Sequence, residues 1–210
     1  MKSPPLDSVE GLIDLIYEAA VLPENWDKVL ARMAQLSNTL GSVLIARSPA
    51  GLKMAGSTPT FLQEATEYFI AFSAQNERLK RLIARGHSGF VADSDVFSFD
   101  EIEAEPMFCD FLIPRGYGQG IATVIPMPTG DEIILHCEGR YARTPMAPEV
   151  IAGMDRMRPH LARAALVASR IAFDRARTAV ETLVRLGIPA AAVGFSGELL
   201  LANEAFDVAG

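Results

Sequence analysis

A long helical pattern over residues 147–186 constrains the fold of this chain more than any other feature. Apolar residues recur along it with a period close to that of an α-helix. One apolar stripe includes Met154 and Leu161, and a second stripe on another face includes Val150 and Phe173. A helix that is apolar on two faces must be buried on two sides. We therefore expect it to pack on a sheet and against the same helix of a second copy of the chain.

The expected contact between two such helices uses mostly small or flexible side chains. These residues are Met154, Met157, Leu161, Ala165, Ala168, Ala172 and Leu183. Pro159 lies within the pattern, and because it lacks a backbone N–H we expect a kink near it. The alternative is that the long helix packs only within its own domain. The first arrangement predicts a homodimer, and the second does not.

Helical and strand-like patterns upstream of the long helix occur in blocks. Helical periodicity covers residues 9–20, 23–40 and 59–85, with shorter helices near 98–101 and 106–112. Apolar β-type runs cover residues 42–47, 52–55, 90–92, 120–127 and 132–138. Turn-type residues join the first two of these runs and also the last two. Hairpins on either side of a helical middle favour an α+β fold with a mainly antiparallel sheet.

The composition is that of a folded protein without a membrane segment or a strongly basic surface. Half of the 210 residues are apolar and 21% are charged, which is enough hydrophobic material to offset the entropy of ordering the chain. No apolar run approaches the length of a membrane span, and the first residues lack an apolar signal core. The formal net charge of -7 argues against a nucleic-acid surface. We expect a cytoplasmic protein that binds neither membrane nor nucleic acid.

The spacing of cysteines and histidines predicts neither a metal site nor a catalytic one. Cys109 and Cys137 lie far apart in apolar surroundings, so we expect buried, inert thiols and no disulfide. His87, His136 and His160 form no metal-type pair and no local triad. We therefore expect no metal, no cofactor and no enzymatic activity. The alternative from another class is a small enzyme that uses His136 or Cys109, because the members of a triad need not be close in sequence.

Two loop motifs resemble ligand sites, but their context favours turns. The glycine-rich stretch at 116–120 precedes a strand, whereas a dinucleotide-binding loop follows a strand and opens a helix. The acidic run at 93–101 lacks the glycine of an EF-hand loop. We interpret the run as a solvated loop in which Ser98 caps a short helix by accepting a hydrogen bond from the amide of Glu101.

Aromatic residues are concentrated in the helical middle of the chain. They are Phe69, Phe72, Phe90, Phe97, Phe99, Phe108, Phe111 and Tyr117. The order of strands and helices is that of PAS-like and GAF-like sensor domains. In such a fold this segment is the wall that faces the sheet and encloses a small-molecule cavity. The predicted pocket residues are Phe69, Phe72, Phe108, Tyr117 and His136. The alternative is that the rings simply fill the core.

Three stretches carry a family resemblance. They are Ile16-Tyr17-Glu18-Ala19-Ala20 followed by Pro23-Glu24-Asn25-Trp26, the run Phe108-x-x-Phe111-Leu112-x-Pro114-x-Gly116, and Arg158-Pro159-His160-Leu161-Ala162-Arg163-Ala164. With them, nearly the whole chain resembles the N-terminal sensory region of bacterial LuxR-type helix-turn-helix transcriptional regulators. The resemblance implies a GAF-like or PAS-like sensory domain over 1–146, a linker and dimerisation helix over 147–187, and the start of a truncated PAS-like segment over 188–210.

The expected function follows from this resemblance together with the composition. We expect a non-enzymatic module that senses an unknown small molecule, forms a homodimer, and relays a signal through the long helix to a C-terminal DNA-binding domain that the sequence lacks. A purely structural dimerisation domain with a filled core is a further alternative. In the segment 188–210 we expect a hairpin with a turn at Ser196-Gly197, followed by a helix capped by Asn203. Because this segment is too small to bury its own faces, it should pair onto existing structure or be poorly ordered.

Overall fold

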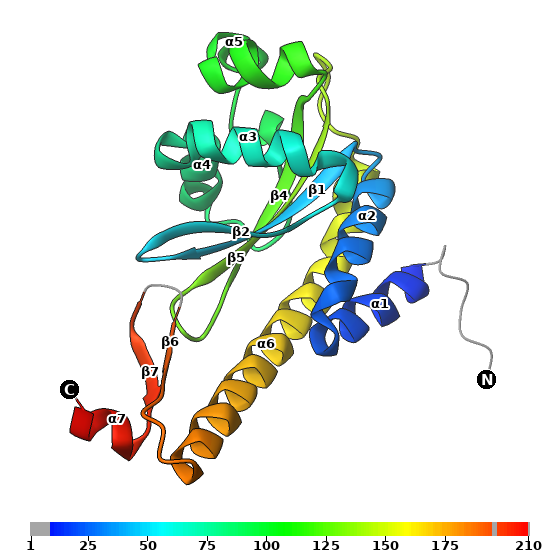
Figure 1. Ribbon diagram of the computed structural model, residues 1–210. Coiled ribbons are helices and arrows are strands. Elements are labelled where there is room, and N and C mark those ends of the chain that lie inside the picture. Colours follow the sequence, from blue (N-terminus) through cyan, green and yellow to red (C-terminus); the bar gives the residue numbers. More distant parts are fainter. Residues whose placement is uncertain (1–8, 195–196, 210) are drawn as a thin grey trace.

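A five-stranded antiparallel sheet forms the centre of the computed structural model, which describes residues 9–194 and 197–209. The strands are β1 (Gly41–Ser48), β2 (Gly51–Ser57), β3 (Val91–Ala92), β4 (Gly118–Pro126) and β5 (Glu132–Arg140). Their order across the sheet is β2-β1-β5-β4-β3, and helices lie on both faces (Figure 1). The predicted α+β fold with an antiparallel sheet, flanking helices and a long C-terminal helix is confirmed.

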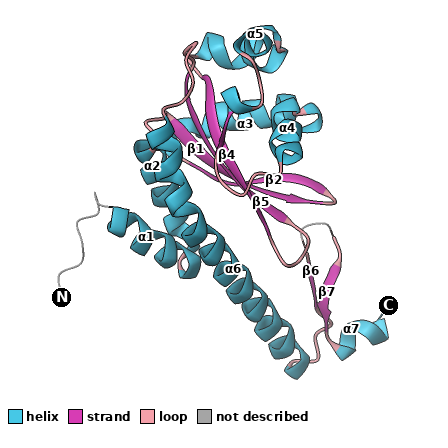
Figure 2. Cartoon of the chain, turned by 180° about the vertical axis from the view of Figure 1, so that it is seen from behind, coloured by secondary structure: helices cyan, strands magenta, loops and turns pink. Residues whose placement is uncertain are grey.

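One face of the sheet is covered by three helices, which are α1 (Val9–Val21), α2 (Trp26–Leu36) and α6 (Pro148–Arg185). Figure 2 shows α1 and α2 lying along the first half of α6. Successive side chains of a strand point to opposite faces, and on this face Leu135 and Cys137 of β5 meet Ile16 of α1, Met33 of α2 and Met154 of α6. All five side chains are buried. We call this the helix-covered face.

The opposite face carries the helical middle of the chain, and we call it the pocket face. Its helices are α3 (Leu62–Phe72), α4 (Glu77–Arg85) and α5 (Phe99–Ala104), followed by a π-helical segment (Met107–Leu112). Short 3-10 turns lie at Pro23–Asn25, Pro59–Phe61, Ser73–Gln75, Asp93–Asp95 and Ile113–Arg115. The predicted cap of α5 is confirmed, because Ser98 Oγ accepts from the amide of Glu101 at 3.2 Å.

Two of the predicted helices differ in extent from those in the structure. The helix predicted over 23–40 ends at Leu36, and Asn38 then adopts a positive φ of 54°. Gly41 is the first residue of β1 and does not end a helix. A glycine is required at this position because the side chain of Phe61 occupies the space that a Cβ would need. The helical region predicted over 59–85 is divided at Asn76, whose side chain accepts from the amide of Leu79 at 2.9 Å and so starts α4.

Helix α6 runs through Pro159 as one element and divides into two differently packed parts. Met154, Met157, Leu161 and Ala165, four of the residues predicted to contact a second copy, are buried in the core of their own domain. Beyond them Ala172 is exposed, and Ala168 and Leu183 are half-buried. On the other stripe, Leu166, Val167 and Phe173 are 49%, 42% and 40% exposed. The domain core covers the first part of the helix, and farther along Val180 is also buried, beside Asn203 of the hairpin, whose Nδ2 lies 3.5 Å from the carbonyl oxygen of Val180. Leu166, Val167 and Phe173 lie between these two covered regions.

The end of the chain forms a small separate sheet beyond α6. Strands β6 (Ala191–Val193) and β7 (Leu199–Ala202) pair with each other and lead into α7 (Glu204–Ala209) at the far end of α6 (Figure 1). The predicted hairpin and cap are confirmed, since Asn203 Oδ1 accepts from the amide of Phe206 at 3.0 Å. The predicted turn residue Ser196 lies outside the described residues. Asn203 Nδ2 also donates to the carbonyl of Ile188 at 2.9 Å, which ties the hairpin to its connection with α6.

Candidate ligand pocket

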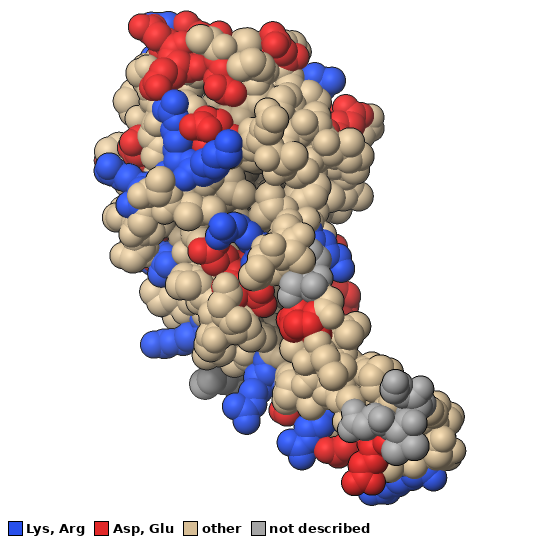
Figure 3. All heavy atoms as spheres, turned by 90° about the vertical axis from the view of Figure 1, so that its left-hand side faces the viewer, with Lys and Arg blue, Asp and Glu red and all other residues tan. Residues whose placement is uncertain are grey.

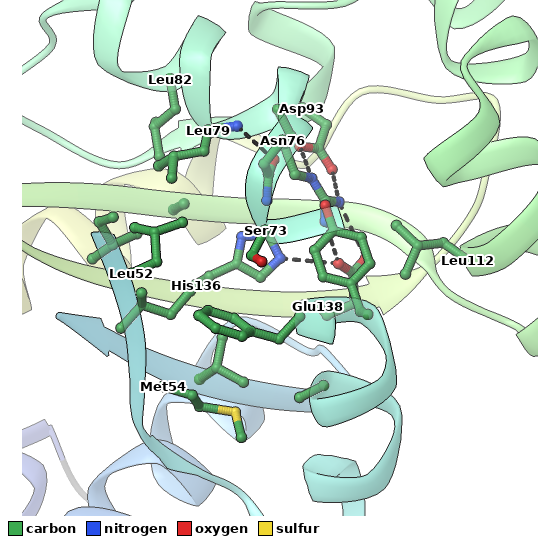
Figure 4. Close-up of a pocket in the computed structure, with 18 of the residues that line it drawn as sticks. Leu52, Met54, Ser73, Asn76, Leu79, Leu82, Asp93, Leu112, His136 and Glu138 are labelled. Carbon is green, nitrogen blue, oxygen red and sulfur yellow. Dashed lines mark hydrogen bonds and ion pairs between the residues drawn. The ribbon is translucent and has the colours of Figure 1, made fainter. Parts of the chain in front are cut away.

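A pocket lies between the pocket face of the sheet and helices α3 and α4 (Figure 4). Its cavity volume is about 70 Å³, which is several times the space that one water molecule requires. The space up to its mouth, part of which is open to solvent, is about 850 Å³. Most of the wall is apolar and includes Leu52, Met54, Leu79 and Leu82. A mainly apolar pocket with a few converging polar groups is the usual form of a small-molecule site.

The alternation along β5 explains why polar groups reach this pocket. Ile134, His136 and Glu138 share one face of the strand and line the pocket, whereas Leu135 and Cys137 face the other way. His136 sits on the central strand, and its pairing partners are Val43 on one side and Ala122 on the other. Because β5 lies in the middle of the sheet, its side chains project into the middle of the pocket face.

A buried cluster of charged residues forms one end of the pocket. Arg78 of α4 donates from Nε to Asp93 Oδ1 at 2.7 Å and from Nη2 to the other oxygen of the same carboxylate. Its Nη1 donates to Glu138 Oε2 at 2.6 Å, and Nη2 lies 3.3 Å from Glu138 Oε1. All three residues are buried, with relative exposures of 7% or less. We call Arg78, Asp93, Glu138 and His136 the charged cluster.

The charged cluster shifts the pKa of several of its members. Burial alone raises the pKa of Glu138, but the charge of Arg78 and the hydrogen bond from His136 outweigh it and lower that pKa to about 2. Burial likewise opposes the charge of Arg78, yet Asp93 and Glu138 raise its pKa well above the ordinary value. Burial raises the pKa of the neighbouring Tyr68 to about 12. The cluster therefore holds an ionised guanidinium and an ionised carboxylate at neutral pH, beside a neutral phenol.

The bond to Glu138 assigns the tautomer of His136. His136 Nε2 lies 2.9 Å from Glu138 Oε2. Because the ionised carboxylate can only accept a hydrogen bond, Nε2 must carry the proton. In the neutral imidazole the other nitrogen, Nδ1, is then a hydrogen-bond acceptor. The pocket is therefore lined by a ring whose Nε2 is engaged by Glu138.

Two glycines of β4 complete the cluster. The amide of Gly118 donates to Glu138 Oε1 at 3.1 Å, and the amide of Gly120 donates to Asp93 Oδ2 at 2.5 Å. A Cβ on Gly120 would lie 2.8 Å from Arg78 Nη2 and would also overlap the ring of His136. The glycines of the 116–120 stretch thus bring the backbone close to the buried carboxylates, a role beyond the turn that the sequence predicted.

The residues predicted to line the pocket are distributed between its wall and the layer behind it. Phe69 and His136 line the pocket. Phe108 is fully buried and lies under the guanidinium of Arg78, 4.8 Å from its carbon Cζ to the ring centroid. Phe72 packs with aromatic neighbours on α3 and the π-helical segment, and Tyr117 packs against Phe61, which is itself a wall residue. These last three support the wall instead of forming it.

The pocket residues predicted from the sequence do not include Asp93 or Glu138, the two acidic members of the charged cluster. Asp93 was assigned to a solvated loop, and that assignment is wrong, because its carboxylate is buried and paired with Arg78. The period-2 pattern of β5 could have indicated Glu138, since it shares a strand face with His136. No local pattern distinguishes Arg78 from the other arginines of α4. Its burial is decided by elements far away in the sequence.

The two cysteines differ from each other in burial. Cys137 is fully buried and accepts a hydrogen bond from Ser42 Oγ at 3.1 Å, and burial raises its pKa to about 11. Cys109 is half-buried, so the prediction that both thiols are buried is wrong for this one. It lies on the outer part of the π-helical segment beside Asp110, and its pKa is raised by partial desolvation and by that carboxylate. Cys109 does not line the pocket.

Two of the three histidines have hydrogen-bond partners other than a serine or cysteine. His136 pairs with Glu138, and His160 Nδ1 lies 3.1 Å from the hydroxyl of Tyr17. Within residues 9–194 and 197–209, no hydrogen bond joins a histidine to a serine or cysteine side chain. In the same part of the chain, no group of three or more His, Cys, Asp or Glu side chains is placed to hold a metal ion.

Two further features of the described residues concern membrane spans and surface charge. None of the helices in the described part of the chain combines the length and apolar character needed to cross a bilayer. In Figure 3 acidic side chains gather at the end of the molecule where α5 lies, and elsewhere on that face both signs of charge are interspersed.

Similar proteins are found by comparing structures and not by comparing sequences. No protein-family model matches the chain, and no curated protein matches it. The VqsR LBD domain from Pseudomonas aeruginosa is similar with a TM-score of 0.56 and 15% identity, over 78% of this chain and 96% of that one. CepR2 from Burkholderia cenocepacia, described as an N-acylhomoserine lactone dependent LuxR family transcription factor, is similar with a TM-score of 0.51 and 15% identity, over 80% of this chain and 99% of that one. The chain therefore has the fold of the ligand-binding domains of LuxR-type regulators, as its sequence resemblance implied.

Proposed function

We propose that this chain is a sensory domain whose pocket binds a small amphiphilic molecule. The observation that carries the proposal is the pocket itself, which is apolar over most of its wall and polar at the charged cluster. Pockets of this kind bind the apolar part of a ligand by burial and orient it through the few polar groups. The structural likeness to regulator domains supports the same role, and the name of CepR2 suggests N-acylhomoserine lactones as the first ligands to try.

The proposed relay uses the sheet and α6. The pocket face and the helix-covered face share the same strands, so a ligand that shifts Ile134 or His136 also shifts Leu135, which packs in the cluster that contains Met154 of α6. A ligand can change the position of α6 only by binding one arrangement of these layers better than another. We propose that residues 1–146 sense the ligand, that 147–187 relay the change, and that the hairpin segment 188–210 begins the part that receives it.

We also propose that the exposed part of α6 contacts a second copy of the chain. Leu166, Val167 and Phe173 lie on the part of the helix beyond the core and are 40% to 49% exposed. Three large apolar residues within two turns of one helix favour a partner helix. The residues predicted for this contact that remain accessible, Ala172 and Leu183, lie on the same part of α6. The homodimer is therefore proposed to use the outer part of α6 only.

Thermal unfolding with a series of N-acylhomoserine lactones tests the sensing role. We expect a concentration-dependent rise in melting temperature for at least one chain length, because a ligand that binds the folded state stabilises it. Leu79→Trp, which places a larger ring in the pocket wall, should abolish the rise. Leu62→Trp on the exposed side of α3 is the matched control and should retain it. A rise that persists in Leu79→Trp would locate binding elsewhere and overturn the proposal.

Light scattering tests the homodimer. We expect a dimer at micromolar concentration, and Val167→Asp should convert it to a monomer because a charge would be placed in an apolar contact. Ile70→Asp is the control, since Ile70 of α3 is 78% exposed and lies outside the proposed contact. A wild-type monomer under these conditions would refute the partner helix and leave the sensing role untouched.

A further inference from the structure

We infer that a second cleft, between the loop at 86–90 and α6, binds a small zwitterion that carries an ammonium and a carboxylate, such as a free α-amino acid. This inference goes beyond the proposed function, because the cleft shares no lining residue with the ligand pocket. It is carried by two side chains of α6 that have opposite charges, line the same cleft and do not pair with each other.

The cleft lies where α6 meets β4 and the loop that precedes β3. Its cavity volume is about 270 Å³, which is many times the space that one water molecule requires. The loop residues His87 and Ser88 are exposed, so the cleft is open to solvent. The lining residues are His87, Ser88 and Gly89 of the loop, and Asp155, Arg158 and Pro159 of α6.

Asp155 keeps one carboxylate oxygen available. Its Oδ1 accepts a hydrogen bond from the amide of Phe90 at 2.6 Å. The other oxygen, Oδ2, has no hydrogen-bond partner among the residues that the structure describes, and it is not buried. A Cβ on Gly89 would lie 2.7 Å from Asp155 Oδ1 and 2.8 Å from His87 Nε2. The glycine at position 89 thus leaves room for both side chains at the wall of the cleft.

Arg158 is anchored along one edge of its guanidinium and available at the other. Its Nε donates to Thr123 Oγ1 at 2.9 Å, and its Nη2 donates to the carbonyl of Val124 at 3.0 Å. Thr123 Oγ1 donates in turn to the carbonyl of Gly89 at 2.9 Å, so the same residue of β4 holds both the guanidinium and the loop. Within residues 9–194 and 197–209, no group accepts a hydrogen bond from Nη1, which is not buried either.

The two charges are close enough to act on one ligand. Asp155 and Arg158 are three positions apart, and side chains at this spacing lie on the same face of a helix. In the described part of the chain no ion pair joins them, and each is held by partners of its own. Their available atoms are therefore an acceptor with negative charge and a donor with positive charge in one cleft.

A zwitterion matches this pair of atoms better than an ion of one sign. An anion would be attracted by Arg158 but repelled by Asp155, and a cation would meet the opposite conflict. In an α-amino acid the ammonium would donate to Asp155 Oδ2, while the carboxylate would accept from Arg158 Nη1, and both bonds would be charge-assisted. The side chain of the amino acid would then lie toward His87 and Ser88.

Thermal unfolding of the wild-type chain with each of the standard L-amino acids at neutral pH tests the inference. At least one should raise the melting temperature by about 3 °C when its concentration is roughly ten times its Kd. Its N-acetyl derivative lacks the ammonium and its α-amide lacks the carboxylate, so each should bind about tenfold more weakly. No rise with any amino acid, or an equal rise with both derivatives, would overturn the inference.

Two variants locate the binding in the cleft. Asp155→Asn keeps an oxygen for the amide of Phe90 but removes the charge, so it should abolish the preference for the amino acid over its N-acetyl derivative. Arg156→Gln is the control, because Arg156 is an exposed arginine of α6 outside the cleft, and it should retain the preference. A preference that persists in Asp155→Asn would contradict the assignment. If that variant does not fold, Ser88→Trp serves instead and should abolish the rise by filling the cleft from the exposed loop.

Leu79→Trp separates this cleft from the ligand pocket. The substitution closes the pocket but lies outside the cleft, so the rise with the amino acid should persist. Loss of the rise in Leu79→Trp would place the amino acid in the ligand pocket and would overturn the second site.

Discussion

The two faces of the central sheet are built from alternate residues of the same strands, yet they are packed in different ways. On β5 (Glu132–Arg140), Leu135 and Cys137 enter a core closed by α1, α2 and α6, with exposures of 1% and 0%. Ile134, His136 and Glu138 enter the pocket face, where a cavity and buried charges take the place of continuous apolar packing. One strand thus contributes to a close-packed interior on one side and to a polar-ended cavity on the other.

The difference separates a close-packed face from a face that holds the proposed ligand pocket. Close-packed apolar cores stabilise a domain through burial and dispersion. Buried ion pairs are weak contributors compared with apolar residues of the same volume, but removing one partner is costly. We interpret the helix-covered face as the main contributor to the free energy of unfolding. The pocket face should contribute less, because it contains a cavity and buried charges. Four predictions test this division.

Loss of the central arginine is expected to have the largest effect. Arg78→Met leaves Asp93 and Glu138 buried without their counter-charge, which should lower the free energy of unfolding by about 3 to 5 kcal/mol. Urea denaturation at pH 7 measures this. Arg143→Met is the control, because its ion pairs with Asp100 and Glu103 are solvent-exposed and should be nearly dispensable. Equal stability of the two variants would mean that the cluster is not electrostatically isolated from solvent.

Truncation on the helix-covered face should come next in size. Leu135→Ala opens a cavity among fully packed neighbours and should cost about 3 kcal/mol. Leu79→Ala removes the same atoms from a half-buried wall beside an existing pocket, so its cost should be about 1 kcal/mol. Chemical denaturation of both variants compares the two faces directly. A larger loss for Leu79→Ala would reverse the assignment of the stabilising face.

The loss of unfolding free energy at acid pH should depend on Glu138. Its pKa of about 2 in the folded chain lies below the ordinary 4.5, so it contributes stability above pH 4.5 that is lost as the pH falls through about 2. The contribution should be on the order of 3 kcal/mol, since one pKa unit corresponds to about 1.4 kcal/mol. The difference in unfolding free energy between wild type and Glu138→Gln should therefore shrink over this interval. A difference that is the same at pH 7 and pH 2 would show that Glu138 is not held ionised by the cluster.

A single methyl group on β4 should have the smallest effect of the four. Gly120→Ala forces a Cβ against Arg78 and His136 and should cost about 1 to 2 kcal/mol. Gly56→Ala on β2 (Gly51–Ser57) is the control, because its Cβ would meet Leu30 at an ordinary 3.4 Å. Thermal unfolding of the two variants distinguishes them. Equal melting temperatures would indicate that the cluster can move away from β4 without loss.

Features that depend on neighbouring residues could be predicted from the sequence. The period of the long helix, the alternation along β5, and the caps at Ser98 and Asn203 follow from contacts within a few positions, and the structure contains all of them. The position of Phe69 and His136 on the pocket wall also follows from these local patterns. Local geometry was sufficient for these because each element forms its own hydrogen bonds and presents its faces at a fixed period.

Long-range packing determines which charges are buried and which elements cover the long helix. Arg78 meets Asp93 and Glu138 across 15 and 60 positions of sequence, so no local pattern could distinguish this arginine or this aspartate from solvated ones. In the same way, the sequence predicts that both apolar faces of α6 are buried. The packing of α1 and α2 determines that Met154 to Ala165 are the part covered within the chain. The elements and their apolar faces can be predicted from local sequence, because they depend on backbone periodicity. The site was decided by tertiary structure, because burial and charge pairing depend on which distant elements meet.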